Sequence, residues 1–378
     1  MSVNATADTT TRPRNSKFKQ KFKQQRLPAW QPILTADTVL PAFFLIGLLF
    51  VPLGVALLLF SDSVVEFQVD YTDCNSTSDA HQIAVGEYLQ CKDVITEPSF
   101  VHGTDTCMCQ IDFTIEKTLE KNVYMYYGLD NFYQNHRRYV KSRDDKQMQG
   151  RVVDEPPSDC RPFDADPDSN EIYAPCGAVA NSLFNDTLRL FVTDTLLGPQ
   201  RKVPLLKNDI AWESDKNIKF HNPPGELNDS PDGAFKGTVK PLYWTKPVWQ
   251  LDEEDPNNNG YENEDLIVWM RTAAFPSFRK LYRRVDHSKS QFKNSLQNGP
   301  YMLEVDYNYP VSSFGGRKRM ILSTTSFLGG KNNFLGIAYI TVGCICFLLG
   351  VIFLVIHVKF GERTTKHLNI NQNTPYSE

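Results

Sequence analysis

The sequence predicts a membrane protein in which two transmembrane α-helices flank a large β-rich domain of the antiparallel, sandwich-like α+β kind. Two long apolar segments without charge lie near the two ends of the 378-residue chain. Six cysteines and three N-glycosylation sequons fall between them, together with seven runs in which apolar and polar residues alternate. The average composition, with 41% hydrophobic residues and a net charge of -4, would suggest a soluble protein and hides the two apolar segments.

The two apolar segments are residues 39–60 and 335–356, which are uncharged throughout. At about 1.5 Å per residue, a helix of this length spans about 33 Å, enough to cross a hydrocarbon core of about 30 Å. A cleaved signal peptide has a shorter apolar region that follows a short basic start. Here 38 residues precede the first segment and Ser61-Asp62-Ser63 offers no cleavage pattern, so we expect a signal anchor.

The distribution of charge predicts the topology. Residues 1–38 carry a net charge of +5, residues 357–378 carry +1, and residues 61–334 carry -10. Because Lys and Arg near span ends mark the cytosolic side, both tails are expected in the cytosol. The region 61–334 is then a lumenal or extracellular domain.

The cysteines of the central region predict disulfide bonds. An even number of cysteines outside the cytosol usually forms disulfides. Cys160 and Cys176 bracket a polar stretch and are expected to pair with each other. The six cysteines are Cys74, Cys91, Cys107, Cys109, Cys160 and Cys176.

The remaining four cysteines leave two pairings open. Cys107 and Cys109 project from one face of a predicted strand, so a bond between them would close a small strained ring. Each is expected to pair with Cys74 or Cys91, either nested (Cys74–Cys109 with Cys91–Cys107) or crossed. We favour the nested pairing because antiparallel neighbours pair outermost with outermost.

Three sequons agree with an extracytosolic domain: Asn75-Ser-Thr, Asn185-Asp-Thr and Asn228-Asp-Ser, the last weakened by Pro231. Asn4-Ala-Thr is cytosolic on this topology and is expected to stay unmodified.

Alternating runs predict half-buried antiparallel strands in the central domain. A helix is expected over 131–141, and long loops over 142–175 and 221–260, where Pro, Asp and turn signals accumulate. The expected strands are 64–69, 110–115, 123–127, 188–192, 266–270, 301–309 and 319–325.

Motifs that carry catalysis are missing from the sequence. It contains no H-E-x-x-H, no G-x-S-x-G and no Walker motif. Asp255, Asn257, Asn259 and Gly260 fit positions 1, 3, 5 and 6 of a calcium loop, but position 12 is Leu266 instead of Glu. We therefore interpret 251–265 as an Asn/Asp-rich turn before a strand and predict no metal, no cofactor and no enzymatic activity.

Glycines recur every seven residues in the second span. Gly336, Gly343 and Gly350 form one stripe along a helix, and Gly47 and Gly54 have the same spacing in the first span. Small residues let another helix approach closely. Two interpretations stay open: the two stripes pack against each other, or the second span offers a groove to a partner's helix.

Several stretches of the chain, in order, resemble the cell division control protein 50 family (transmembrane protein 30 family) over nearly the whole length. Asn333 departs from the family pattern, which often has Pro there. The stretches are Phe22–Pro32, Ala174–Thr187, Ile210–Trp212, Asp215–Phe220, Ile267–Ala274, Phe278–Tyr282, Arg317–Thr325, Gly329–Asn332 and Phe334–Tyr339.

The resemblance implies a non-catalytic (beta) subunit of a type IV P-type ATPase, a flippase that moves aminophospholipids to the cytosolic leaflet. Such a subunit is needed for assembly, for exit from the endoplasmic reticulum and for activity. It implies residence in the endoplasmic reticulum, Golgi, endosomes and plasma membrane, contact with membrane lipid, and no nucleic acid. It places Arg26, Pro28, Trp30 and Pro32 in a cytosolic contact with the ATPase and makes Asn185 a glycan site.

The alternative from another class is a free-standing adhesion or ligand receptor at the cell surface. That interpretation predicts an outside ligand and no membrane partner. An ectoenzyme would need a catalytic constellation that the sequence lacks.

Overall fold

The chain forms two compact units, one of residues 1–58 with 334–378 and one of residues 59–333. The structure is a computed structural model and describes residues 21–25, 35–84, 86–101, 105–120, 122–153, 155–193, 200–327 and 329–367.

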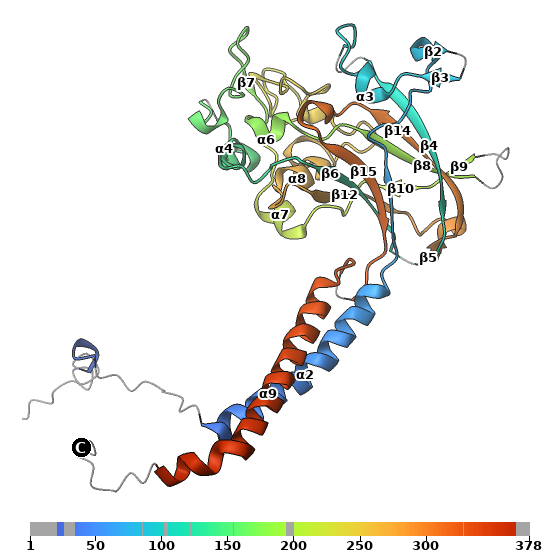
Figure 1. The fold of residues 1–378 in the computed structure, drawn as a ribbon. Helices are drawn as coiled ribbons and strands as arrows, with labels where there is room; N and C mark the ends of the chain where they lie inside the picture. Colours follow the sequence, from blue (N-terminus) through green and yellow to red (C-terminus); the bar gives the residue numbers. More distant parts are fainter. Residues whose placement is uncertain are drawn as a thin grey trace, which may run out of the picture. The chain divides into compact units, whose positions relative to one another are not determined.

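The first unit contains two helices long and apolar enough to cross a membrane. They are α2 (Ala36–Asp62) and α9 (Phe334–His367), with apolar stretches at Thr38–Asp62 and Phe334–Phe360 (Figure 1). Large apolar side chains such as Leu48 and Leu348 are exposed on their outer faces, as expected of helices that contact lipid. The chain is therefore a membrane protein with two spanning helices.

The two helices run antiparallel and touch along their glycines. A Cβ placed on Gly54 would lie 2.8 Å from the backbone nitrogen of Ile340, and one on Gly343 would lie 2.8 Å from Cγ2 of Val51. Phe50 and Tyr339 add an aromatic contact with ring centroids 5.0 Å apart. Without hydrophobic force between helices in lipid, close backbone approach supplies much of the attraction.

The second unit is built on two antiparallel sheets (Figure 1). In the five-stranded sheet the order is β1 (Glu66–Asp70), β15 (Arg317–Ser323), β6 (Tyr124–Asp130), β12 (Phe278–Val285) and β10 (Leu205–Leu206). In the four-stranded sheet the order is β4 (Cys107–Ile115), β14 (Gly299–Tyr307), β8 (Thr187–Thr193) and β9 (Gln200–Lys202).

The inner faces of the two sheets share one hydrophobic core. Phe67 of β1 stacks on Phe113 of β4 at 5.0 Å between ring centroids. The hydroxyl of Tyr282 in β12 accepts a hydrogen bond from the backbone N–H of Leu188 in β8, at 3.1 Å. Aromatic pairs of this kind bury a large area and fix the spacing of the sheets. The predicted pair of transmembrane helices flanking an antiparallel β-rich domain is thus confirmed.

Short helices and strands cover the sheets and their connections. They are η1 (Asp79–His81), β2 (Gln82–Ala84), β3 (Glu87–Tyr88), α3 (Cys91–Val94), β5 (Leu119–Glu120), α4 (Arg137–Lys141), α5 (Asp145–Met148), η2 (Ser158–Cys160), β7 (Ile172–Tyr173), α6 (Ala178–Asn181), α7 (Glu213–Ile218), β11 (Thr238–Val239), η3 (Val248–Gln250), η4 (Gly260–Glu262), α8 (Glu264–Met270), η5 (Ser290–Phe292), β13 (Ser295–Leu296) and η6 (Ser312–Phe314).

One predicted strand is a helix. Residues 266–270 belong to α8, whose first turn is capped because Oδ1 of Asn263 accepts a hydrogen bond from the N–H of Leu266 at 3.0 Å. Four of these five apolar side chains are buried, so periodicity could not distinguish a strand from a buried helix. Trp269 packs against Tyr127 of β6, with ring centroids 6.4 Å apart.

Other boundaries also differ from the prediction. The helix expected over 131–141 is confined to α4, because His136 before it is extended (φ −62°, ψ 129°) and Asn131 adopts a left-handed backbone conformation with φ 59°. Strand β12 was not predicted, since its inward positions include Lys280 and Tyr282 instead of plain apolar residues. The stretch 142–175 contains short packed elements and is not one long loop.

The glycine contact predicts a cross-link. With Cys344→Ala and Cys346→Ala as background, Val51→Cys with Gly343→Cys is expected to form an intramolecular disulfide on mild oxidation. The added substitution Gly54→Leu should slow this reaction, because a side chain there meets the backbone of Ile340. Non-reducing electrophoresis after cleavage within the central domain measures it.

The matched control places the first cysteine at Leu48, which is exposed on the outer face of α2. Equal cross-linking from both positions would contradict the helix contact.

Candidate functional site

Two disulfides join the segments around β1 and α3 to the start of β4. Cys74 is bonded to Cys109 and Cys91 to Cys107, which is the nested arrangement. All four are buried. The sulfur atoms of Cys74, Cys91 and Cys109 lie within 4.8 Å of one another. They are disulfide sulfurs and therefore not the thiolates that bind a metal ion.

A third disulfide, Cys160–Cys176, closes part of the stretch that covers the end of the domain. It lies in a small separate cluster with Tyr173 and Val239. The hydrogen bond from the N–H of Cys176 to Oε1 of Gln147, at 2.8 Å, ties this cluster to α5. The segment between Cys160 and Cys176 is thus held by its disulfide and by a hydrogen bond from its backbone to Gln147.

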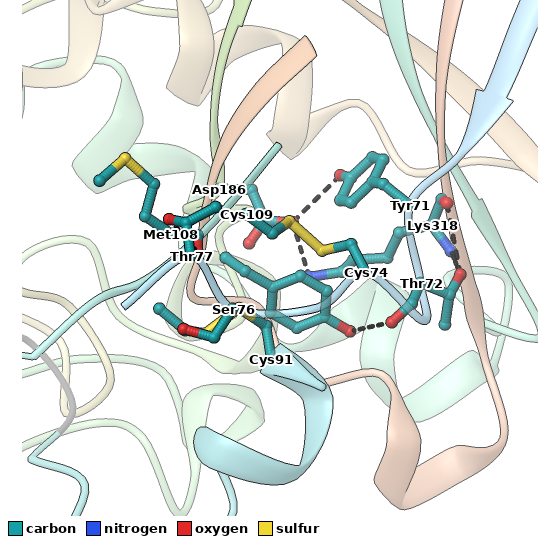
Figure 2. Close-up of a disulfide and its surroundings, with 12 residues drawn as sticks. Tyr71, Thr72, Cys74, Ser76, Thr77, Cys91, Met108, Cys109, Asp186 and Lys318 are labelled. Atoms are coloured by element: carbon teal, nitrogen blue, oxygen red, sulfur yellow. Dashed lines mark hydrogen bonds and ion pairs between the residues drawn. A yellow bond between two sulfur atoms is a disulfide. The ribbon is translucent and has the colours of Figure 1, made fainter. Parts of the chain in front are cut away.

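Next to the Cys74–Cys109 disulfide lies a fully buried ion pair. Nζ of Lys318 in β15 is 2.7 Å from Oδ2 of Asp186, and both side chains have no exposed surface. Figure 2 shows Lys318 and Tyr71 converging on Asp186; the Tyr71 hydroxyl donates a hydrogen bond to Oδ2 at 3.0 Å. Burying a charged pair is unfavourable unless every remaining polar group finds a partner.

The partners are present. Oδ1 of Asp186 accepts hydrogen bonds from the N–H groups of Asn308 and Tyr309, each at 2.7 Å. Lys318 also donates to the carbonyl oxygen of Tyr309 at 2.8 Å, and its Nζ lies 3.0 Å from the ring centroid of Tyr307. Burial lowers the pKa of Lys318 from 10.5 to about 8, with the charge of Asp186 opposing that shift.

This network connects four segments that are distant in the sequence: the end of β1, the start of β8, the end of β14 and the start of β15. It therefore joins the two sheets at one edge. Breaking one member of such a pair costs about 3–5 kcal/mol, since the other charge stays buried without compensation.

A second buried lysine, Lys280 of β12, caps the C-terminal end of α8. Nζ of Lys280 donates to the carbonyl oxygens of Val268, Trp269 and Arg271 at 2.9, 2.8 and 2.6 Å. Carbonyls at the C-terminal end of a helix have no partner within the helix, and a cation at this end also interacts favourably with the helix dipole. Burial lowers the pKa of Lys280 from 10.5 to about 7.

The start of α8 is held in a corresponding way by Glu264. Its carboxylate accepts hydrogen bonds from the N–H groups of Asp209, Ile210 and Ala211 at 3.0, 2.7 and 2.9 Å. Lys216 of α7 adds an ion pair at 2.6 Å. Burial by itself raises the pKa of Glu264, but these hydrogen bonds outweigh burial, and the pKa is lowered. Both ends of α8 thus depend on buried charges.

The stretch 251–265, interpreted from the sequence as an Asn/Asp-rich turn before a strand, leads into helix α8 (Glu264–Met270) instead of a strand. Oδ1 of Asp255 accepts from the N–H of Asn257 at 3.0 Å, and Oδ1 of Asn259 accepts from the N–H of Asp252 at 2.8 Å. These oxygens bond to the loop's own backbone, as in Asx turns. Leu266, at the position of the bidentate Glu, is buried within α8.

The three sequons lie in different surroundings. Asn75 is exposed, next to the Cys74–Cys109 disulfide. Asn185 is half-buried beside the ion pair, and its Oδ1 is buried without a partner among the described residues. Asn228 is half-buried, and its Oδ1 accepts from the N–H of Ser230 at 3.1 Å.

The described histidines do not form a common site. Nδ1 of His81 lies 2.8 Å from the hydroxyl of Ser76, while Nε2 of His287 accepts from the N–H of Val123 at 3.2 Å. His81 thus bonds within its own segment, whereas His287 joins the segment after β12 to the residue before β6. His102 lies outside the described residues.

The predicted partner contacts fall into two groups. Arg26, Pro28, Trp30 and Pro32 lie outside the described residues. The second group is the glycine stripe of α9, which faces α2 of the same chain, the first of the two interpretations considered for it; these glycines are Gly336, Gly343 and Gly350.

Sequence reasoning missed the buried charges. Lys318 shares a strand face with Met320 and Leu322, both buried, so a lysine at an inward position of an alternating run was the available signal. Asp186 was visible only as the middle residue of a sequon. Nothing in the sequence indicated that Glu264 binds the backbone of residues 209–211.

Comparison with known proteins gives matches over almost the entire chain. The model of the LEM3 (ligand-effect modulator 3) family / CDC50 family matches residues 57–363. Cell cycle control protein 50A of Bos taurus is 52% identical over 353 residues, which cover 93% of this chain and 90% of the relative. Cell cycle control protein 50B of Homo sapiens is 42% identical, covering 96% and 98%. ALA-interacting subunit 3 of Arabidopsis thaliana is 38% identical, covering 97% and 94%.

The ion pair predicts a large loss of stability when only one partner is removed. Lys318→Met should lower the free energy of unfolding by about 3–5 kcal/mol, since Asp186 stays buried as an uncompensated charge. Thermal unfolding of the purified full chain in detergent, followed by circular dichroism, measures this.

Adding Asp186→Asn to Lys318→Met should restore part of that loss, at least about 1 kcal/mol, because the amide oxygen still accepts from the two N–H groups and no charge remains. The sequon at Asn185 is retained. A double variant no more stable than Lys318→Met would contradict this account.

Lys280 predicts a pH dependence. Its folded pKa of about 7 lies below the usual 10.5, so the unfolded chain binds more protons between these values and stability rises with pH in this window. The wild type should gain about 2 kcal/mol more than Lys280→Met between pH 7 and 9. Melting temperatures at the two pH values measure this, and parallel curves would exclude it. Lys318 is present in both chains and cancels.

Proposed function

The chain belongs to the LEM3/CDC50 family, and on this premise we propose that it is the non-catalytic beta subunit of a type IV P-type ATPase lipid flippase. In this role it is needed for assembly of the catalytic chain, its exit from the endoplasmic reticulum and its activity in moving aminophospholipids to the cytosolic leaflet. Family membership over nearly the full length is the observation that carries the proposal.

The names of the relatives support an accessory role. The Arabidopsis thaliana relative is named an ALA-interacting subunit, which describes a protein that works bound to another. Among the described residues, His287, Glu264 and Asp186 and the six cysteines of the central domain are engaged in structural bonds: hydrogen bonds to the backbone, an ion pair and disulfides. An accessory subunit requires a stable shape and surfaces for binding, and these bonds provide stability.

The proposed topology places residues 61–334 in the lumen or outside the cell and both tails in the cytosol. Three disulfides support an oxidising compartment for this region. The basic tail of residues 1–38 supports a cytosolic N-terminus. We place the protein in the endoplasmic reticulum, Golgi, endosomes and plasma membrane, with N-glycans on Asn75, Asn185 and Asn228.

The helix pair is suited to assembly and ill suited to transport by itself. Thr341 lies within α9, where its hydroxyl donates to the carbonyl oxygen of Ile337 at 2.8 Å. The pair therefore offers an apolar outer face to lipid or to the helices of a larger membrane protein. The cytosolic contact is assigned to Arg26, Pro28, Trp30 and Pro32.

The second candidate is a cell-surface receptor for adhesion or ligands. The family match argues against it, because that match runs from the end of the first span through the whole central domain and all of the second span. The receptor interpretation predicts that the chain has no membrane partner, and this difference can be tested.

Affinity purification of the full chain in mild detergent distinguishes the two. We expect a P-type ATPase chain to co-purify at about 1:1 and to be identified by mass spectrometry. Trp30→Ala should reduce its recovery roughly tenfold, since buried Trp side chains dominate the energy of interfaces. Asn15→Ala in the same tail is the control.

Recovery of the chain alone, at native expression and with intact disulfides, would favour the receptor. Equal recovery of the ATPase with Trp30→Ala would contradict the proposed contact of the N-terminal tail, but not the assignment as a subunit.

A further inference from the structure

One turn of the β domain exposes a phenylalanine close to the membrane spans. Phe327 follows β15 and is 94% exposed, more than any other large apolar side chain in the part of the chain that the structure describes. A single exposed apolar residue is common on protein surfaces and needs no explanation by itself. The position of this one, between the last strand and α9, makes it informative.

Hydrogen bonds fix the shape of this turn. The N–H of Ser326 donates to the carbonyl oxygen of Gly329 at 2.8 Å, and the N–H of Gly329 donates to the carbonyl oxygen of Ser326 at 3.0 Å. The hydroxyl of Ser326 adds a bond to the same Gly329 oxygen at 3.1 Å. Gly329 has a left-handed backbone with φ 103°, a conformation that favours glycine. The turn therefore holds Phe327 in place while its ring stays exposed.

Both limbs of the turn are attached beside the end of the first span. Before the turn, the N–H of Thr324 donates to the carbonyl oxygen of Val65 at 3.0 Å. After it, the N–H of Asn332 donates to Oγ of Ser61 at 2.9 Å. Ser61 lies within the apolar stretch Thr38–Asp62. The chain thus enters and leaves the turn at the place where the first span ends.

The turn is short enough to stay near this place. Phe327 follows Thr324 by three residues and precedes Asn332 by five. An extended chain covers at most about 3.6 Å per residue, so Cα of Phe327 lies within about 11 Å of one attachment and about 18 Å of the other. The headgroup region adds about 5–8 Å to each side of the hydrocarbon core. Residues 59–333 form one unit, so the turn and the end of the first span are placed relative to each other.

The limb after the turn also packs on the five-stranded sheet, at the end from which both connections to the spans leave. Glu66 at the start of β1 pairs with Ser323 at the end of β15. A Cβ placed on Gly330 would lie 2.9 Å from Nη2 of Arg279, and the same guanidinium pairs with Glu66 at 2.6 Å. The turn is therefore fixed to the sheet as well as to the end of α2.

The charges beside the turn balance. Residues 307–361 contain no Asp or Glu, so neither the turn nor the connection to α9 carries a carboxylate. Lys331 in that connection is exposed, as is Asp62 at the end of α2, and Glu66 is paired with Arg279. A phospholipid surface is then neither strongly attracted nor strongly repelled. Burial of the aromatic ring is the driving force that remains for a contact with lipid.

The apolar surface of the first span continues up to the residue that holds the turn. Leu59 and Phe60 lie directly before Ser61 and are 66% and 48% exposed. Exposed apolar side chains on a spanning helix contact lipid. Aromatic side chains are favoured where headgroups meet acyl chains. The position of the turn therefore selects lipid over a protein as the partner of Phe327.

We propose that Phe327 is a third membrane contact of this protein, in addition to the two spanning helices. Its ring inserts between headgroups and acyl chains in the leaflet on the side of the β domain. Two spans hold the domain through two connections only, and a third contact beside them restricts its tilt against the bilayer surface. The proposal requires two spanning helices and is independent of the proposed function.

Photo-cross-linking to lipid tests the proposal. The full chain with p-benzoylphenylalanine in place of Phe327 is placed in nanodiscs of dioleoylphosphatidylcholine and illuminated. Mass spectrometry of the peptide that contains residue 327 should show an added phospholipid. The matched control carries the probe in place of Phe275, which is 73% exposed but precedes the opposite end of the sheet, where Phe278 pairs with Leu129. Its yield should be roughly tenfold lower, because only the membrane interface places lipid beside the ring.

A spin label provides the second measurement. In a background of Cys344→Ala and Cys346→Ala, Phe327→Cys and Phe275→Cys each carry a nitroxide in the same nanodiscs. The ratio of collisions with oxygen to collisions with a water-soluble nickel complex should be about fivefold higher at residue 327, since oxygen prefers an apolar medium. Because burial of the ring drives the contact, the ratio should be the same at low and high salt. Thermal unfolding in detergent shows that each variant is folded.

Each outcome decides the proposal. A lipid adduct at residue 327 together with a high, salt-independent oxygen ratio supports it. Absence of a lipid adduct there, equal yields at residues 327 and 275, or equal oxygen ratios overturn it. A ratio at residue 327 that falls to that of residue 275 in high salt overturns insertion of the ring. An adduct with a co-purifying protein in place of lipid also overturns it.

Discussion

The buried pair of Lys318 and Asp186 is the interaction on which the β domain depends most. It sits where the two sheets meet, and it recruits Tyr71 and the backbone of Asn308 and Tyr309. A buried charge is tolerated only when every donor and acceptor around it is satisfied. The strands that contribute to this network therefore have little freedom to shift, and their positions are specified as well as stabilised.

Disulfides and buried charges together stabilise the irregular parts of the β domain. Many elements outside the two sheets have only two to five residues, too short to be stable alone. The nested disulfides hold the segments near β4, while Lys280 and Glu264 hold the two ends of α8. These bonds hold parts of the surface in place without regular structure, which suits a protein that presents binding surfaces.

The two membrane-spanning helices are held together by a different kind of contact. Charges are absent from the two apolar segments, so the helices meet through small residues and aromatic rings. Glycines in both helices let Gly54 and Gly336 approach at the backbone. The same stripe that could have received a foreign helix is filled by the chain's own first span, so the contacts available to a partner within the membrane lie on the outer faces of the pair.

Sequence alone determined the two spans, the antiparallel β-rich domain between them and the family. Each of these depends on a signal that can be read along the chain: long uncharged apolar segments, alternation of apolar and polar residues, and family motifs in order. Tertiary structure decided what depends on contacts between distant residues. A run of five apolar residues, 266–270, suits a strand or a buried helix equally, and only Asn263, Glu264 and Lys280 around it select the helix. The ion pair joins residues 132 positions apart in the chain, and no local pattern encodes that separation.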